Sequence, residues 1–234
     1  MTNWNANIDT RQPCWDGYRD LLARLHGPDF PDADRLSALL PAGTVSGGGA
    51  PLRFVAAGAL PGVAYERHIF ATGQVPTRER NGHDLFNALA WCRWPLLKAA
   101  MNAAHCHQLN KSGAGCQTTY KAAHQTGRGP LRDALTLLDE SGALVIARNR
   151  NVLQTLARRD WLSAFQLLRC AWQGDVRVVL CGHALLEKSL APYKSLTAHA
   201  LLLHLAAPSL QGEAPLRQVD AALAERLSAD ALFA

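Results

Sequence analysis

A short and almost uninterrupted apolar run at residues 176–181 constrains the fold of this chain most. The run is Val-Arg-Val-Val-Leu-Cys, and a valine-rich segment of this length is typical of a strand buried within a sheet. Gly182 ends the run, and the apolar spacing from His183 to Leu190 predicts a helix. The chain should therefore contain a covered strand that leads directly into a helix.

Apolar spacing predicts several further helices, with boundary errors of roughly 2 to 4 residues. Asn81 or Thr77 can cap a helix, and Pro95 should divide it from a second helix that runs to about Leu109. Asp160 can cap the helix expected at residues 161–172. The remaining helices are expected at residues 15–25, 34–40, 152–156 and 215–227.

Two pairs of strands are also expected. Gly58 to Gly62 is a turn-like link between strands at 52–56 and 63–70, and Pro76 should break extended structure after them. Asp139-Glu140-Ser141-Gly142 should form the turn of a hairpin whose strands are 134–138 and 143–147, while 201–205 fits a strand or a helix. The predicted fold class is α+β, a small mixed or antiparallel sheet with hairpins packed against several helices.

The length of 234 residues allows one large domain or two small ones, and one globular domain over residues 1–234 is favoured. Its predicted parts are a helical segment at 1–50, which ends in a Gly-rich connector, and a main body at 51–234; a mobile loop is expected at 111–128. Hydrophobic residues make up 48% and charged residues 18%, so the chain can bury a core. The net charge of +5 permits attraction to phosphates, but it is too small to indicate the dense basic surface of a typical nucleic-acid-binding protein.

Compartment and membrane contact follow from other patterns. The first ten residues lack the features of a secretory signal, and no apolar segment is long enough to insert into a membrane. The six cysteines form no C-x-x-C pair, and they are expected to be reduced thiols of a cytoplasmic protein. His105-Cys106-His107 with Cys116 does not have the spacing of a structural zinc site.

Two histidine motifs are candidates for chemistry. On a helix His83 and Asn87 would share one face with Asp84 beside it, although Asp84 could instead serve only the helix start. His183 follows a buried strand, a position where α/β proteins often expose functional groups, and Glu187 lies one turn further on. His183 and Glu187 could bind a metal or transfer protons, or could form an ordinary hydrogen bond on the helix surface.

Charged pairs elsewhere add to the candidate set. Arg132-Asp133 precedes an expected strand, where the carboxylate could act as a base, a metal ligand or a partner of the arginine. With strand alternation Glu66 would face inward and need a partner, for which Arg78 is the candidate. Asp139 and Glu140 are expected to have only a structural role in their turn.

Several fragments occur in a fixed order along the chain: Tyr65-Glu66, 73–78, 83–89, Pro95 with Lys98 and Asn102, 132–137, 139–142 and 182–188. Together they resemble the bacterial domain-of-unknown-function family 3025, from about Trp15 onward. The resemblance implies no reaction. The chain departs from the family pattern at Gly82, where the family usually has an aromatic residue, and it ends at Ala234 without the family's usual Pro-, Gly- and aromatic-rich tail. If that tail helps to cover the site, the resemblance implies a more open protein or an altered function here.

These observations predict one shared polar site and leave three functions open. The first is a metal-assisted hydrolase for an anionic, perhaps phosphoester, substrate, which would use a divalent metal ion as cofactor. The second is a binding or regulatory module with a buried polar network. The third is a nucleic-acid-binding protein, if Arg148, Arg150, Arg158 and Arg159 line one face. The hydrolase site would contain catalytic His83, Asp84, Asp133 and His183, substrate-binding Arg78, Asn87 and Arg132, and metal-binding His183 and Glu187.

Overall fold

The computed structural model describes residues 8–58, 62–111 and 130–228. The chain divides into two compact units, the first formed by Met1–Pro28 and Leu138–Val219 and the second by Asp29–Leu137 and Asp220–Ala234. Each unit combines helices with a small sheet, so the fold is α+β as predicted. Of the helices in the described ranges, none has both the length and the apolar character that a bilayer span requires.

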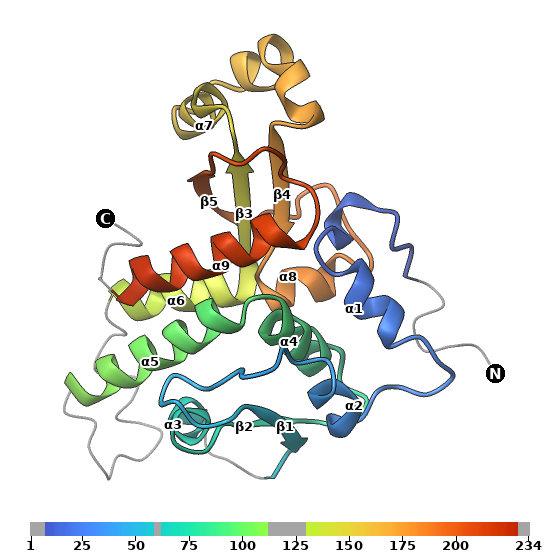
Figure 1. The fold of residues 1–234 in the computed structure, drawn as a ribbon, viewed down its shortest axis with the longest axis vertical. Coiled ribbons are helices and arrows are strands. Elements are labelled where there is room, and N and C mark those ends of the chain that lie inside the picture. Colours follow the sequence, from blue (N-terminus) through green and yellow to red (C-terminus); the bar gives the residue numbers. More distant parts are fainter. Residues whose placement is uncertain (1–7, 59–61, 112–129, 229–234) are drawn as a thin grey trace. The chain divides into compact units, whose positions relative to one another are not determined.

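The first unit is built on a three-stranded sheet with the strand order β4-β3-β5 (Figure 1). The central strand β3 (Gly142–Ala147) is buried along its whole length. It pairs antiparallel with β4 (Val176–Leu180) and parallel with β5 (His199–His204), so the sheet is mixed. The predictions of strands at 176–181 and 143–147 are confirmed, and 201–205 is a strand.

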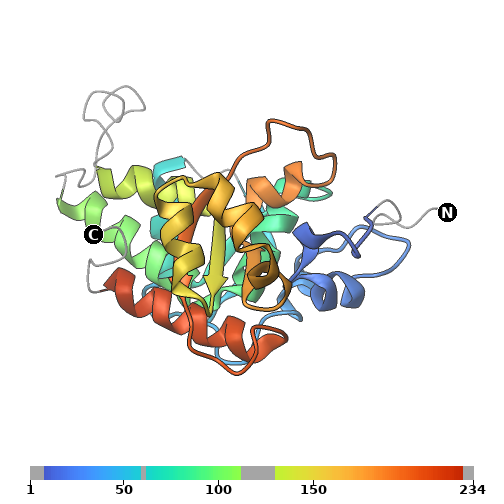
Figure 2. The same ribbon diagram turned by 90° about the horizontal axis from the view of Figure 1, so that it is seen from above.

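Helices surround this sheet and close its core. The core under α7 contains Val145, Ala147, Val152 and Val176, and Figure 2 shows α7 and the following helical turns over one end of the sheet. The predicted helix at 161–172 is instead a π-helical turn followed by a 3₁₀ helix. The helices of the first unit are η1 (Pro13–Trp15), α1 (Arg19–Arg24), α7 (Arg150–Ala157), η2 (Ser163–Leu167), η3 (Arg169–Gln173) and α8 (His183–Lys188).

The N-terminal segment is anchored to β4 by polar contacts. The Tyr18 hydroxyl donates to the Leu180 carbonyl at 2.8 Å, and the buried Arg177 donates from Nε to Asp16 at 2.7 Å. Arg177 also donates to the carbonyls of Leu210 and Gly212 at 2.8 and 2.7 Å. These bonds compensate for burying the guanidinium group, which would otherwise be costly.

The second unit contains a parallel pair of strands, β1 (Arg53–Ala56) and β2 (Gln74–Thr77). The strand predicted at 52–56 is confirmed, but the strand predicted at 63–70 is wrong, because these residues lie in helix α3 (Gly62–Thr72). Two adjacent parallel strands need a crossover connection, and this helix supplies it. Pro76 lies within β2 and does not end it.

Gly73 explains how α3 ends where it does. Its backbone has φ +68°, which glycine adopts without strain. The Gly73 amide donates to the Ile69 carbonyl at 2.8 Å and closes the last helical turn. A Cβ atom at this position would collide with the Pro51 carbonyl oxygen at 2.1 Å. The turn therefore brings the start of β2 directly against the segment before β1.

Two of the predicted helix signals in the second unit are confirmed. Asn81 caps α4 by accepting a hydrogen bond from the Asp84 amide at 3.0 Å. The helix is interrupted before Pro95, which begins α5. The Gly-rich connector of 42–50 is organised around Ser46, whose buried hydroxyl donates to the Phe70 carbonyl at 2.9 Å. The other helices of this unit are α2 (Ala33–Ser37), α4 (Gly82–Arg93) and α5 (Pro95–Lys111).

Two helices contribute residues to both units, α6 (Pro130–Ser141) and α9 (Glu213–Ser228). The predicted hairpin at 134–147 is wrong, since α6 continues through Ser141 and leads straight into β3. Leu135 and Leu138 are buried three positions apart, which suits a helix face. The loop predicted at 111–128 lies, apart from Lys111, outside the described residues.

Candidate functional site

The most concentrated polar chemistry of the first unit surrounds His183. This residue begins α8 directly after β4 and is 5% exposed. Its Nδ1 atom lies 3.7 Å from Asp139 Oδ2, and its Nε2 atom lies 3.7 Å from Glu140 Oε2. Each ring nitrogen therefore faces a carboxylate. Both distances exceed hydrogen-bond length, and the contacts are ion pairs only when the imidazole is protonated.

Two glycines let the carboxylates approach the imidazole. The Gly182 and Cys181 amides both donate to the Gly142 carbonyl, at 2.9 and 3.0 Å. A Cβ atom at Gly182 would lie 2.3 Å from the Gly142 amide nitrogen and 2.7 Å from the Glu140 carbonyl carbon. The end of α6 is thus pressed against the start of α8, with backbone on backbone. This close approach places Asp139 and Glu140 beside His183.

The position of these acids within α6 is electrostatically unfavourable. Asp139 and Glu140 lie in the last turn of the helix, which has no basic residue. The backbone carbonyls give this end of a helix a partial negative charge, and carboxylates there are destabilised while cations are favoured. A positive group at this point would offset both sources of negative charge. The arrangement is therefore suited to a cation or an imidazolium.

A second histidine, His199, lies beside the junction of α6 and β3. The Ser141 hydroxyl and His199 Nδ1 are 2.9 Å apart, and His199 pairs with Gly142 at the start of β5. Asp139, Glu140 and His199 were missed by the sequence analysis. The acids were assigned to a hairpin turn, and the two glycines that bring α6 and α8 together were the signal that could have identified them.

The structure also places the remaining predicted residues of α6 and α8. Asp133 is exposed in the first turn of α6, before the acids of the last turn. Arg132 is half-buried, and its Nε atom is buried and makes no hydrogen bond within the described residues. Glu187 follows His183 by one turn of α8 and is half-buried. The predicted roles of these three residues stay predictions.

In the second unit Arg78 pairs with Asp84 and not with Glu66. The guanidinium donates from Nε and Nη2 to the two Asp84 carboxylate oxygens at 2.9 and 2.8 Å, and the Arg78 amide donates at 2.7 Å. Burial tends to raise the pKa of Asp84, but the hydrogen bonds from Arg78 outweigh it and lower the pKa. The pairing predicted between Glu66 and Arg78 is wrong, because it relied on strand alternation in a segment that is helical.

The other predicted polar residues of this unit form hydrogen-bonded chains. Buried Lys98 donates to Asn87 Oδ1 at 2.9 Å, and Asn87 Nδ2 donates to the Tyr65 hydroxyl at 3.2 Å. Buried Asn102 donates to the Glu66 carboxylate at 2.7 Å and accepts the Gly47 amide at 3.1 Å. These bonds link α3, α4, α5 and the Gly-rich connector. They hold Asn87 and Glu66 in the packing of this unit, and the substrate-binding role predicted for Asn87 stays a prediction.

His83 lies half-buried in the first turn of α4 in the second unit, next to Asp84. The predicted convergence of His83, Asp133 and His183 at one site stays a prediction. Of the set His105, Cys106, His107 and Cys116, the last lies outside the described residues, and the Cys106 thiol contacts the Glu66 carbonyl at 3.5 Å.

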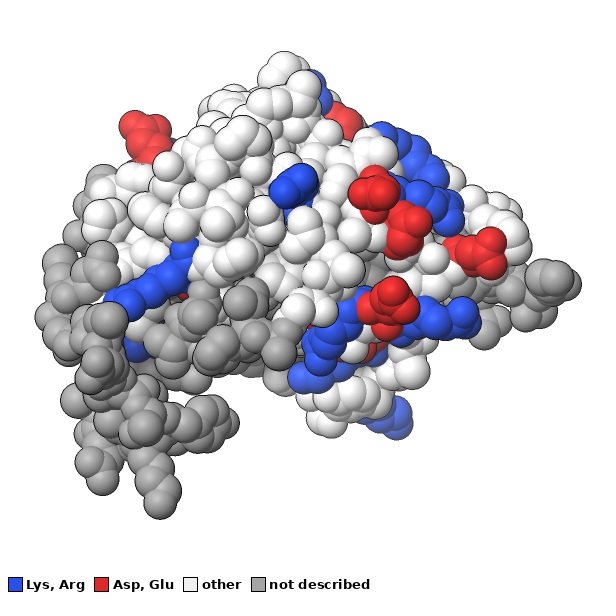
Figure 3. Space-filling model, turned by 90° about the horizontal axis from the view of Figure 1, so that it is seen from below, with Lys and Arg blue, Asp and Glu red and all other residues white. Residues whose placement is uncertain are grey.

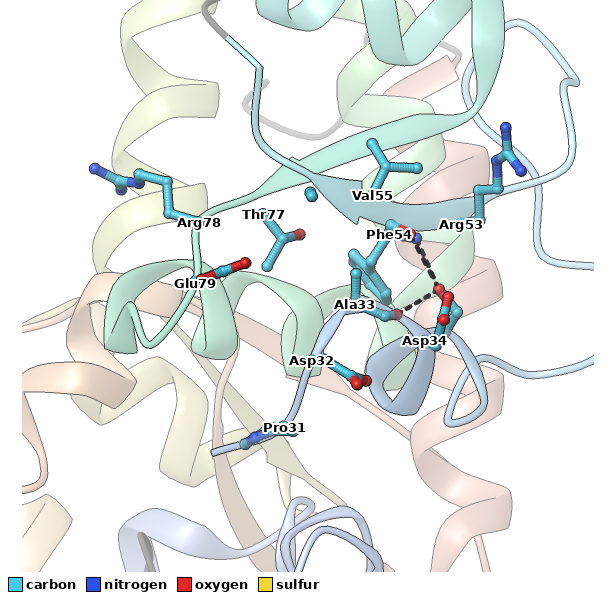
Figure 4. Close-up of a pocket in the computed structure, with 12 residues that line it drawn as sticks. Pro31, Asp32, Ala33, Asp34, Arg53, Phe54, Val55, Thr77, Arg78 and Glu79 are labelled. Atoms are coloured by element: carbon cyan, nitrogen blue, oxygen red, sulfur yellow. Dashed lines mark hydrogen bonds between the residues drawn. The ribbon is translucent and has the colours of Figure 1, made fainter. Parts of the chain in front are cut away.

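A hollow of about 450 Å³ lies beside β1, β2 and α2 in the second unit. Its lining includes Asp34, Thr77 and Glu79, and Figure 4 shows the guanidinium groups of Arg53 and Arg78 extending away from its centre. The Thr77 hydroxyl already donates to the Val75 carbonyl at 3.1 Å. The lining therefore combines acidic groups with a satisfied hydroxyl and does not define a ligand.

Comparison with known proteins gives a family. A family model described as a protein of unknown function (DUF3025) matches residues 52–234. No curated protein and no solved structure matches the chain.

Proposed function

The chain belongs to the DUF3025 family, whose description names no reaction, and from the site itself we propose a metal-assisted hydrolase that acts on an anionic substrate such as a phosphoester. One observation carries the proposal: the buried His183 imidazole has a carboxylate facing each of its two nitrogens.

Different roles are proposed for the two acids. Metal-binding histidines usually have their second ring nitrogen directed at a carboxylate, which fixes the orientation of the ring. Asp139, on the Nδ1 side, fits this orienting role. His183 Nε2 and Glu140 Oε2 then face the ion as ligands.

The geometry on the Nε2 side is close to that of a metal site. Two ligand atoms of one ion at about 2.1 Å from each lie roughly 3 to 3.5 Å apart, against 3.7 Å between Nε2 and Oε2. A small side-chain movement would close this difference. A cation would also offset the acids at the negative end of α6.

Arg132 is proposed to bind the substrate on its sequence pattern alone, because a guanidinium group can hold an anionic group. Arg78 is less suited, since Asp84 already accepts from its guanidinium. When bound, a divalent ion would supply water that is deprotonated near neutral pH. His83, Asp84, Asp133 and Glu187 are proposed as further members of the site on their sequence patterns alone.

Metal titration tests this proposal. The purified protein is titrated with Mn²⁺, Mg²⁺ or Zn²⁺ while its thermal unfolding and its hydrolysis of p-nitrophenyl phosphate are followed. An ion at about 100 times its dissociation constant should stabilise the fold by roughly 2.7 kcal/mol. Glu140→Gln keeps the shape of the side chain but removes its charge, and it should abolish both responses while the variant stays folded.

Matched controls separate site residues from general charge effects. His204 lies at the opposite end of β5 from His199, and Glu225 is exposed on α9. His204→Asn and Glu225→Gln should behave like the unchanged protein, whereas His183→Asn should lose the metal response. His83→Ala tests whether that residue shares the site. An unchanged metal response in Glu140→Gln and His183→Asn would rule the proposal out.

A binding or regulatory module is the alternative, and the chains from Lys98 to Tyr65 and from Asn102 to Glu66 favour it. They explain the presence of several of the predicted polar residues without requiring that the protein catalyse a reaction. Under this alternative Lys98→Met should lower stability, and neither the unchanged protein nor the variant should hydrolyse the phosphoester.

The nucleic-acid alternative has narrower support. Arg148 and Arg150 line an open hollow of about 690 Å³ at the end of β3 and β5, although Arg148 lies 3.4 Å from Asp175. Figure 3 is seen from below Figure 1 and does not show the end that carries α7; on the face that it draws, acidic and basic side chains are interspersed. A phosphate backbone is bound best by a field of one sign.

A further inference from the structure

The helical turns between α7 and β4 expose an unusual number of large apolar side chains. Trp161, Leu162, Phe165 and Leu167 are 56%, 59%, 50% and 75% exposed. We call these four residues the apolar patch. Single exposed apolar residues are ordinary, but a group of them within seven positions of one segment marks an interaction surface.

A π-helical turn holds the patch in place. The Leu168 amide donates to the Ser163 carbonyl at 2.9 Å, one residue further back than in an α-helix. This leaves the Ala164 carbonyl to accept from the Trp172 indole nitrogen at 2.7 Å. The Trp172 ring in turn stacks on Phe165, with centroids 5.1 Å apart, and Phe165 stacks on Trp161 at 6.2 Å. The exposed side chains are therefore held in place by this hydrogen bond and by the stacked rings.

The opposite side of the same segment already completes the core. Leu168, Ala171 and Trp172 pack against the cluster that contains Val152 and Val176. Figure 2 looks down on these turns, and no other described segment of the first unit lies over them. The packing of the first unit therefore does not require the apolar patch.

The charges around the patch are mostly positive. Arg158 and Arg159 stand just before Trp161, Arg169 stands two positions after Leu167, and all three are exposed. The acid within this stretch is Asp160, which accepts the Ser163 amide at 3.0 Å as a helix cap. Aromatic and leucine side chains flanked by arginines match an anionic lipid interface, where apolar groups enter the headgroup region and cations remain at the phosphates.

We propose that the apolar patch docks this protein on the surface of a membrane that contains anionic lipids. A second copy of the chain fits less well, because the same arginines would face one another across the contact. Single-stranded nucleic acid also fits less well. It stacks on open aromatic faces, whereas Phe165 already stacks on two tryptophans and the most exposed residues are leucines.

Vesicle sedimentation tests the proposal with the whole 234-residue chain. Vesicles of phosphatidylcholine alone are compared with vesicles in which about one third of the lipid is phosphatidylglycerol. The protein should bind the second kind, and binding should weaken with added salt. Leu162→Ser combined with Leu167→Ser should reduce partitioning by about tenfold or more. Arg158→Gln combined with Arg159→Gln should reduce it by about fivefold per arginine.

Leu190→Ser is the matched control, since Leu190 is 47% exposed in the same unit but lies outside the patch. It should partition like the unchanged protein. Absence of binding to anionic vesicles, or equal binding of the leucine double variant, would overturn the proposal. So would oligomerisation or single-stranded DNA binding that the leucine double variant abolishes, because the patch would then serve a different partner.

Discussion

At the residue scale, Asp220 shows how a buried carboxylate can be both useful and costly. It lies on α9 and accepts the Leu97 and Leu96 amides at 2.8 and 3.1 Å, which caps the start of α5. Burial raises its pKa from 3.8 to about 6, while the bonds from Leu97 and Leu96 lower it. The folded protein therefore favours the protonated side chain more than the unfolded chain does.

The pH dependence of stability should reveal this residue. A raised pKa gives stability that is fully present below the unfolded value of 3.8 and is lost as pH rises through about 6. From well below the lower pKa to well above the higher one, the free energy of unfolding should fall by roughly 3 kcal/mol more than that of Asp220→Asn. The variant does not titrate, but it loses one acceptor for the Leu96 amide at every pH.

Urea unfolding of both proteins from about pH 4 to pH 7 measures the difference. A difference that stays constant across this window would mean that Asp220 titrates as it does in the unfolded chain. Exposed Glu225 is again a suitable control, because Glu225→Gln should leave the pH profile nearly unchanged.

At the element scale, the contact between the α6–β3 junction and the β4–α8 junction decides whether the candidate site exists. Gly142 and Gly182 bring the two backbones together, and there is no room for a side chain at either position. The carboxylates and the imidazole are carried by elements that this contact holds together. Positioning by packed backbone is more accurate than positioning by long side chains.

Gly182→Ala should therefore damage both stability and metal binding. The added Cβ atom would meet backbone atoms at 2.3 to 2.7 Å, and overpacking of this kind costs about 1 to 3 kcal/mol. Gly58→Ala is the matched control, since nothing lies within 4 Å of its added atom. Denaturant titration gives the stability of each variant, and calorimetric titration with Mn²⁺ gives its affinity. Equal metal affinity in Gly182→Ala and the unchanged protein would contradict the assigned role of this contact.

At the scale of the whole molecule, the two compact units are joined through shared helices. Each of α6 and α9 begins in one unit and ends in the other. Unfolding one unit would require part of each helix to lose its packing while the rest remained folded. The predicted single domain therefore implies one cooperative unfolding transition.

Two core leucines provide a matched test of this cooperativity. Leu144 in β3 belongs to the first unit and Leu89 in α4 to the second, and both are fully buried. Leu144→Ala and Leu89→Ala should each cost about 2 to 5 kcal/mol. Each should shift the whole transition, followed by circular dichroism and tryptophan fluorescence. Two separate steps, with each variant moving only one of them, would show that the units unfold independently.

Features that depend on near neighbours could be predicted from the sequence alone. They include the Asn81 cap, the break at Pro95, the valine-rich strand of 176–181 and the helix that starts at His183. Caps, prolines and buried strands carry local signals, since their physical cause lies within a few residues. For the same reason His183 was identified as a candidate from its position after the strand.

Only the tertiary structure decided the helical state of 62–72 and 130–141 and the composition of the candidate site. Glu140 ends an apolar segment that suits a strand or a helix, and acids at a helix end are unfavourable by local rules. Their carboxylates face His183, which lies far along the chain, across a contact that needs Gly142 and Gly182. Local propensity contains no information about such a partner, because the energy that favours the helix comes from packing between distant segments.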